Sequence, residues 1–242
     1  MNIVVVGCGF IGSHVAEEIP KLLYSQDRSA NITFVDYDTW EDRNAANQNV
    51  SGRVAASEEY KAETCARYAN EYNGINARAL NVKLTAVNAQ EILSDADLII
   101  ECVDNIPTRQ LLWGFALAGA SGPVMHTGIS RQGDGIINWS SPTFDTFPFK
   151  PGSIAGRNLK EQDIKEPPCE MYKYRTAGMF LVQGIAKAAA FYMGLDPWDM
   201  LEGAEEEGSM TCWNTNTNGI KLQFDEMFLQ DDFFPVYLRE DS

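Results

Sequence analysis

The chain has 242 residues, of which 45% are hydrophobic and 22% charged, as expected for a soluble globular protein with enough core to fold by itself. Its 19 basic and 34 acidic residues give a net charge of −15, which argues against nucleic acid or an anionic membrane as a partner. No apolar run is long enough to cross a bilayer, and the chain enters a predicted strand at once. Neither a signal peptide nor a membrane span is therefore expected, and a cytoplasmic location is predicted.

The first predicted element is a buried strand over residues 3–6, which ends in a Gly-x-Gly-x-x-Gly motif formed by Gly7, Gly9 and Gly12. An apolar periodic segment follows the motif, as a helix would. The glycines allow a tight turn and a close approach of backbone to phosphate, and the start of the helix offers free N–H groups to an anion. The motif predicts a nucleotide site and, by itself, leaves NAD, FAD, S-adenosylmethionine and ATP open.

Residues 31–36 are predicted to form a second strand with an acidic end. A carboxylate at this place, roughly 20 residues beyond a glycine motif, is suited to accept hydrogen bonds from ribose hydroxyls. Asp36 is the candidate, and Asp38 is held in reserve because residues two apart in an extended chain point to the same side.

A polar, asparagine-rich segment over 39–53 is predicted to be a loop beside the nucleotide, where functional residues are usually carried. A helix is then predicted over 54–72, and it carries Lys61 and Arg67. Both charges could belong to a solvated surface. In the functional interpretation, Lys61 lies near the phosphates.

The rest of the core is predicted to contain strands over 79–87, 97–104 and 123–128. A short helix over 90–94 and a longer one over 107–120 are predicted between these strands, and a returning hairpin is predicted over 130–139. Asp104 and Asn105 lie at the end of the strand over 97–104. They therefore lie at the carboxyl edge of the predicted sheet, where open α/β sheets bind ligands.

Beyond this core, the sequence predicts a long irregular segment over 142–168, a buried apolar helix over 176–193 and a strand pair between residues 210 and 238. The predicted fold class is α/β, with a Rossmann-like, doubly wound and mostly parallel sheet that is extended by antiparallel C-terminal strands. No internal repeat or linker divides the chain.

The cysteines lie far apart, without a Cys-x-x-Cys pair, at Cys8, Cys65, Cys102, Cys169 and Cys212. This spacing is typical of reduced thiols in a cytosol. The two histidines, His14 and His126, are also isolated, so a zinc site is not expected.

Several of these features, in this order, resemble the ATP-binding apparatus of the ThiF/MoeB/ubiquitin-activating-enzyme superfamily over roughly residues 2–195. Two of the family's motifs lie early in the chain, Asp-x-Asp-Thr at 36–39 and Asn-x-x-Arg-Gln at 44–48. Three others follow, Cys-x-Asp-Asn-x-x-x-Arg at 102–109, Gly-x-Gly at 133–135 and Pro-x-Cys at 167–169. Asn47 stands where the family has a phosphate-binding arginine. The resemblance implies one adenylation domain over 1–242, with a nucleotide-binding core at 1–141, a crossover loop at 142–172 and C-terminal helix and strands at 173–242.

The resemblance also implies an activity, which is the ATP- and Mg²⁺-dependent adenylation of the C-terminal carboxylate of a small ubiquitin-like or sulfur-carrier protein. The residues that it assigns to ATP are Gly7, Gly9, Gly12, Asp36, Asp38, Asn44, Arg53 and Lys61. Asp104 would hold magnesium. Cys169 would be a nucleophile that takes over the activated carboxyl group, although its neighbours Glu166 and Glu170 disfavour a thiolate. The chain would form a homodimer, or a heterodimer with another ThiF-like chain.

Two alternatives stay open. Asn47 in the place of an arginine favours an adenylation-fold subunit that binds a partner without catalysis. The run from Gly9 to His14 also resembles the loop of extended short-chain reductases, which would make the chain an NAD-dependent oxidoreductase. Such enzymes need a Tyr-x-x-x-Lys pair, which this sequence lacks.

Overall fold

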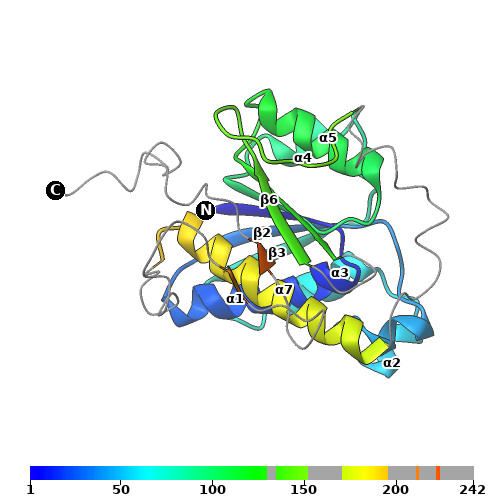
Figure 1. Ribbon diagram of the computed structural model, residues 1–242. Coiled ribbons are helices and arrows are strands. Elements are labelled where there is room, and N and C mark those ends of the chain that lie inside the picture. The colour runs from blue at the N-terminus through cyan, green and yellow to red at the C-terminus, as the bar shows by residue number, and fades with distance from the viewer. Residues whose placement is uncertain (130–134, 152–170, 196–210, 213–221, 224–242) are drawn as a thin grey trace.

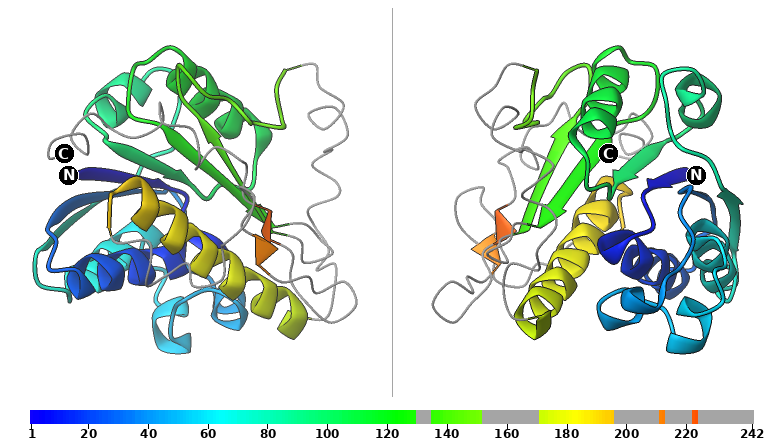
Figure 2. Two further views of the ribbon diagram at one scale, coloured as in Figure 1. Left: turned by 60° about the vertical axis from the view of Figure 1, so that its left-hand side comes forward. Right: turned by 90° about the vertical axis from the view of Figure 1, so that its right-hand side faces the viewer.

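An eight-stranded sheet with helices on both faces forms the body of the protein in the computed structural model (Figures 1 and 2). The structure describes all residues except 130–134, 152–170, 196–210, 213–221 and 224–242. Within the described part of the chain, no helix is both long enough and apolar enough to span a membrane.

The strands follow the order β3-β2-β1-β4-β5-β6-β8-β7. Their bounds are β1 (Asn2–Val6), β2 (Ala30–Val35), β3 (Ile75–Leu80), β4 (Leu98–Glu101), β5 (Val124–Ile129), β6 (Gly135–Ser140), β7 (Thr211–Cys212) and β8 (Leu222–Gln223). Neighbours from β3 to β5 are parallel, β6 is antiparallel to β5, and β7 and β8 form an antiparallel pair beside β6. The predicted fold class is confirmed, including the strand pair near the C-terminus.

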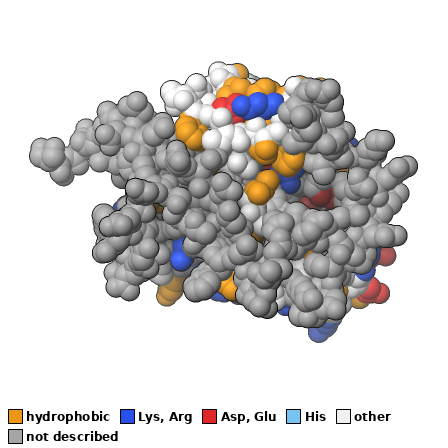
Figure 3. Space-filling view, viewed as in Figure 1, with side chains coloured by type: hydrophobic (Ala, Val, Ile, Leu, Met, Phe, Trp, Pro, Cys, Tyr) orange, Lys and Arg blue, Asp and Glu red, His pale blue; other side chains and the backbone are white. Residues whose placement is uncertain are grey.

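The helices are α1 (Phe10–Ser25), η1 (Asp42–Ala46), α2 (Gly52–Ala55), α3 (Lys61–Ala69), α4 (Ala89–Leu93), α5 (Ile106–Leu117) and α7 (Met171–Tyr192). α1, α3 and α7 cover one face of the sheet, and α4 and α5 cover the other (Figure 1). At the top of the view in Figure 3, over α4 and α5, hydrophobic side chains adjoin basic and acidic ones, so the outer surface of this helical layer is mixed in character.

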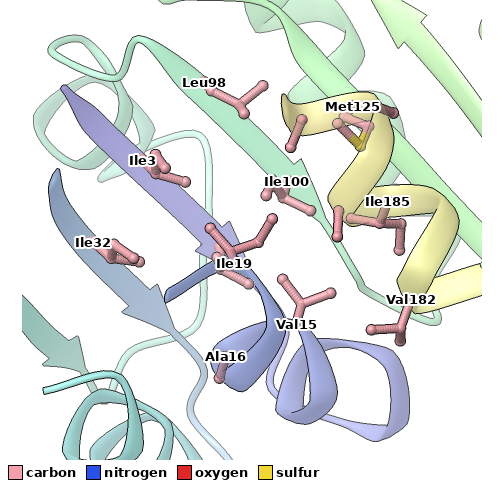
Figure 4. Close-up of a cluster of buried hydrophobic side chains, with 14 of the residues drawn as sticks. Ile3, Val15, Ala16, Ile19, Ile32, Leu98, Ile100, Met125, Val182 and Ile185 are labelled. Carbon is pink, nitrogen blue, oxygen red and sulfur yellow. The ribbon is translucent and has the colours of Figure 1, made fainter. Parts of the chain in front are cut away.

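The larger core lies between the sheet and the layer formed by α1, α3 and α7, and Figure 4 shows how it is built. Ile3 and Ile100 project from the sheet toward Val15 and Ile19 of α1, and Ile185 of α7 closes the cluster (Figure 4). All five side chains are at most 1% exposed. Residues alternate along a strand, so the intervening positions face the smaller core under α4 and α5. The apolar run of the first strand is thus explained by burial on both faces.

The prediction of one helix over 54–72 is wrong in its middle, because a non-helical segment separates α2 from α3. Thr39 pairs with Tyr60 in an isolated bridge, and the N–H of Trp40 donates to the carbonyl of Glu59 at 2.9 Å. Glu58 adopts a φ of +58°, which a helix cannot contain. The segment predicted to be a loop over 39–53 likewise contains η1 and the start of α2.

The strand predicted over 79–87 is wrong in its position, because β3 ends at Leu80. β3 pairs in parallel with β2, which ends opposite Leu80 at Val35. On the outer edge of β3, the side chain of Asn70 bonds both backbone groups of Ala77, at 2.8 and 2.9 Å. The residues after Leu80 therefore leave the sheet. The strand predicted over 97–104 is likewise shorter, since β4 ends at Glu101.

Candidate functional site

A cavity of about 340 Å³ lies at the carboxyl ends of β1, β2, β4 and β5. Strand order reverses around β1, which has β2 on one side and β4 on the other. Connections to opposite faces of the sheet leave a crevice at such a point. The predicted site residues that line the cavity are Gly7, Gly9, Asp36, Asp38, Lys61 and Asp104.

The glycine loop forms the floor of the cavity between β1 and α1. Gly7 has a φ of +93°, and a Cβ there would lie 2.8 Å from the carbonyl oxygen of Cys102. A Cβ at Gly12 would collide with the carbonyl of Gly7. Gly9, at the start of α1, differs because, apart from its chain neighbours, no atom of the described residues lies within 4 Å of the place where its Cβ would be. The space over Gly9 therefore belongs to the cavity, and a phosphate group could approach the backbone there.

Asp36 is held rigidly at the end of β2. Its Oδ2 accepts the N–H of Cys8 at 2.6 Å, and its Oδ1 accepts the N–H of Asp38 at 2.9 Å. Burial raises the pKa of the Asp36 carboxyl, and these two hydrogen bonds oppose the rise. Each oxygen keeps acceptor capacity toward the cavity, which suits hydroxyl donors such as those of a ribose.

Lys61 is the first residue of α3, and its side chain is buried although it is charged. Its Nζ lies 3.7 Å from Oδ2 of Asp38 and 5.7 Å from the centre of the Trp40 ring. The backbone N–H of Lys61 donates to the carbonyl of Asp38 at 3.0 Å, which fixes the start of the helix beside the cavity. An ammonium held this way, with one long carboxylate contact, retains donors for an anionic ligand.

Asp104 lies in the turn between β4 and α5, and its side chain is exposed. Asn105 caps α5 by accepting the N–H of Thr108 at 3.0 Å. Within the described part of the chain, the Asp104 carboxylate makes no hydrogen bond or ion pair, so both oxygens are available to a ligand.

Acidic and basic side chains both line the cavity. Tyr37 lies at the rim with its side chain half exposed, and its pKa is raised by the charge of Asp38 first, then by burial, Asp36 and Asp104. Lys83 lies 5.6 Å from the centre of the Tyr37 ring. One cavity is thus lined by two ammonium groups, those of Lys61 and Lys83, and by the three carboxylates of Asp36, Asp38 and Asp104.

The donor set bears on whether magnesium fits this site. No cluster of three or more histidine, cysteine or acidic side chains that could hold a metal occurs in the part of the chain that the structure describes. Mg²⁺ with a nucleotide is usually bound by one or two carboxylates together with phosphate oxygens and waters. The free oxygens of Asp104 fit that kind of binding.

Two thiols lie near the cavity, of which Cys8 is buried and Cys102 is half-buried. Cys102 lines the wall, and burial raises its pKa to about 12. Burial also raises the pKa of Cys8, with further contributions from Cys65 and Asp36. Thiols of this kind are inert at neutral pH. Cys169 lies outside the described residues.

Three of the predicted ATP ligands do not line the cavity, namely Gly12, Asn44 and Arg53. Asn44 is buried, but its Oδ1 accepts the N–H of Glu41 at 2.9 Å as part of the cap of η1. Arg53 is exposed on α2 and does not line the cavity. The carbonyl of Asn47 accepts a hydrogen bond from Nε2 of His14 at 3.1 Å. The side chains of Asn44, Arg53 and Asn47 do not line the cavity.

Other residues line the cavity although they were not predicted as ligands. Gln48 is one, and its Oε1 is buried without a hydrogen bond to the described residues. Its place in the 44–48 motif was the available signal. Arg109 lines the wall and closes the 102–109 motif. Lys83 had no such signal, because residue 83 was predicted within a strand.

Comparison with known proteins gives one family. The ThiF family model matches residues 1–151. The adenylyltransferase and sulfurtransferase MOCS3 of Xenopus laevis is 27% identical over 113 residues, which are 46% of this chain and 24% of that protein. The match therefore spans about a quarter of the length of MOCS3.

Solved structures of E. coli MccB share the fold. MccB with ATP has a TM-score of 0.54 at 18% identity, over 77% of this chain and 55% of MccB. MccB with MccA-N7isoASN has a TM-score of 0.55 at 16% identity, over 77% of this chain and 56% of MccB. The chain thus spans little more than half of MccB.

Proposed function

The chain belongs to the ThiF family, and from this premise we propose that it binds ATP with Mg²⁺ and adenylates the C-terminal carboxylate of a small ubiquitin-like or sulfur-carrier protein. One observation carries the proposal. Lys61, Asp36 and Asp104, from three separate elements, surround a single cavity whose floor is open at Gly9.

In the proposed reaction, a carboxylate oxygen of the partner attacks the α-phosphorus of ATP. The bond from that phosphorus to pyrophosphate breaks, so an acyl-adenylate and pyrophosphate form without net proton transfer. Asp36 accepts hydrogen bonds from the ribose, Lys61 binds phosphate oxygens, and the backbone at Gly9 approaches the phosphates. Holding both reactants in line lowers the barrier, because their orientation is fixed before the chemistry.

The charge of the cavity supports a metal ion brought in with the nucleotide. Lys61 and Lys83 face Asp36, Asp38 and Asp104, so the wall does not itself neutralise a triphosphate. When bound, Mg²⁺ supplies positive charge at the phosphate oxygens, and Asp104 would hold it.

The relatives support this choice among nucleotide chemistries. MOCS3 is named an adenylyltransferase and sulfurtransferase, and MccB has been solved with ATP and with MccA. The proposal treats residues 1–242 as one adenylation domain, in line with a single sheet that reaches from β3 to β7. It also includes a cytoplasmic location and a homodimer or a heterodimer with a second ThiF-like chain.

ATP–pyrophosphate exchange with candidate carrier proteins tests the proposal. We expect exchange by the wild type and none by Asp104→Ala, whereas Asp95→Ala, which changes an exposed acid away from the cavity, should be as active as the wild type. We assign a later transfer to Cys169, whose thiolate would attack the carbonyl carbon of the acyl-adenylate, so that a thioester forms and AMP leaves. A thiol-sensitive adduct with the carrier should therefore be missing in Cys169→Ala, and full adduct in that variant would refute the assignment.

A second candidate is a catalytically silent subunit. Among the described residues, Arg109 is the one arginine that lines the cavity, and its charge is paired with Glu101. Asn47 and Arg53 do not replace the family's phosphate-binding arginine. Binding of both ATP and a carrier without any exchange would favour this candidate. Binding of NAD and not ATP, measured by calorimetry, would contradict both.

A further inference from the structure

A buried ion pair joins β4 and α5, the two elements on either side of Asp104 in the chain. Glu101 is the last residue of β4 and is completely buried, and Arg109 of α5 is 8% exposed. Nη1 of Arg109 lies 2.9 Å from Oε1 and 3.1 Å from Oε2 of Glu101. His126 of β5 approaches Oε2 through its Nδ1 at 2.9 Å. Three elements that end at the cavity are therefore joined through one carboxylate.

The same pair also holds the backbone between Glu101 and Asp104. Nη2 of Arg109 donates to the carbonyl of Val103, and the N–H of Val103 donates to Oε1 of Glu101 at 3.3 Å. Nη1 of Arg109 also donates to the carbonyl of Thr127 at 2.8 Å. Both polar backbone groups of Val103 are thus bonded to the pair, and Asp104 is the next residue.

Asp104 has no comparable support of its own. Its carboxylate makes no bond to the described part of the chain, so its direction depends on the backbone that carries it. In contrast, each oxygen of Asp36 is held by an N–H group. Of the three carboxylates that line the cavity, Asp36 is therefore fixed directly, whereas Asp104 is fixed only through its neighbour Val103.

We propose that Arg109 and Glu101 are positioning residues, which hold the Val103–Asp104 backbone so that the Asp104 carboxylate meets a nucleotide-bound metal ion. The inference rests on the proposed function for the ligand and on the contacts above for the geometry. It assigns Arg109 to the support of Asp104 instead of to the phosphates, because the donors of its Nη1 are taken by Glu101 and Thr127. Groups that orient a metal ligand in this way commonly change metal affinity by about 10- to 100-fold when they are removed.

Two measurements on four variants test the proposal. The first is the ratio of ATP affinities with and without Mg²⁺, by calorimetry. The second is hydrogen exchange of the amides of residues 102–105 without any nucleotide. The variants are Arg109→Lys, Glu101→Gln, the double variant Glu101→Met with Arg109→Met, and Asp104→Asn. The double variant leaves no unpaired buried charge, so it should fold even if Glu101→Gln does not.

We expect Arg109→Lys, Glu101→Gln and the double variant each to reduce the Mg²⁺ ratio by about 10- to 100-fold, as Asp104→Asn does, and to speed exchange at 102–105. The effects of the two single changes should not add, since both remove one interaction. Arg67→Lys is the matched control, because Arg67 and Glu59 form an exposed pair at 3.0 Å on α3, and it should alter neither measurement.

Three results would overturn the proposal. The first is that Arg109→Lys loses ATP affinity equally with and without Mg²⁺ while Glu101→Gln binds ATP as the wild type does. This result would make Arg109 a phosphate ligand. Faster exchange with an unchanged Mg²⁺ ratio would make the pair purely structural. Unchanged hydrogen exchange at residues 102–105 in these variants would show that the ion pair does not hold the backbone at Val103. A wild type that binds no ATP would instead contradict the proposed function, and the exchange measurement would still test the support.

Discussion

The glycines of the loop after β1 serve different purposes. A side chain at Gly7 or Gly12 would meet the protein's own backbone, so these two glycines are needed for packing. A Cβ at Gly9 would meet none of the described residues beyond its chain neighbours, and a side chain there would enter the cavity. The motif therefore serves folding at two positions and the ligand at the third.

Gly9→Ala is expected to fold normally and to bind ATP more weakly. The added methyl group would occupy the approach to the backbone N–H groups, and losing one hydrogen bond to a charged group costs about 1.5–3 kcal/mol of binding. Calorimetry with ATP measures the affinity, and urea unfolding should show a change below about 1 kcal/mol in stability.

Gly7→Ala is the matched variant at the same loop. A side chain at a φ of +93° costs about 1–2 kcal/mol, and the contact with Cys102 adds to this cost. It should therefore lower the free energy of unfolding where Gly9→Ala does not. Equal stability of the two variants, or unchanged ATP affinity in Gly9→Ala, would contradict this division of roles.

Among the elements, the contact of α1 with α7 connects the core to the site. A Cβ at Gly178 of α7 would collide with the ring of Phe10, which begins α1 and lines the cavity. Tyr174, one turn earlier on α7, lies 5.2 Å from the same ring and also lines the cavity. The close approach of the two helices at Gly178 thus sets one wall of the site.

Gly178→Ala should destabilise the protein by about 1–3 kcal/mol, because the ring of Phe10 must move to admit the methyl group. Gly114→Ala on α5 is the control, since its Cβ would meet no side chain or neighbouring segment within 4 Å in the part of the chain that the structure describes. A helical alanine at this exposed position should stabilise by about 0.5–1 kcal/mol. Urea unfolding measures both, and a loss of stability in Gly114→Ala alone would refute the packing argument.

At the scale of the whole molecule, stability should depend on pH through His14. His14 of α1 is buried beneath the segment that carries Asn47, and burial lowers its pKa from the ordinary value of 6.5. The unfolded chain therefore binds the proton at a higher pH than the folded protein does. This contribution to stability is complete above pH 6.5 and is lost as pH falls toward the lower pKa of the folded protein.

His14→Gln should flatten this part of the stability profile. Glutamine can donate to the carbonyl of Asn47 as His14 does, but it does not titrate. Urea unfolding of both proteins at neutral and mildly acidic pH measures the difference. An equal loss of stability in His14→Gln on acidification would assign the pH dependence to other groups.

Local chemistry determined much of the fold and part of the candidate site. An apolar strand, a glycine turn and a helix are neighbours in the chain, so β1, the loop at Gly7 and α1 could be predicted from their own residues. Asp36 and Asp104 follow predicted strands, and parallel strands bring their carboxyl ends to one edge. These two carboxylates could therefore be placed at the cavity without knowledge of tertiary contacts.

Only the tertiary structure decided features that depend on distant partners. The bridge of Thr39 with Tyr60 divides the predicted helix, and the end of β2 determines where β3 ends and hence that Lys83 reaches the cavity. The ion pair of Glu101 with Arg109 likewise depends on how α5 packs against β4 and β5. Sequence periodicity reports which face of an element is buried, but not which residue it meets, because pairing and register are decided by the rest of the fold.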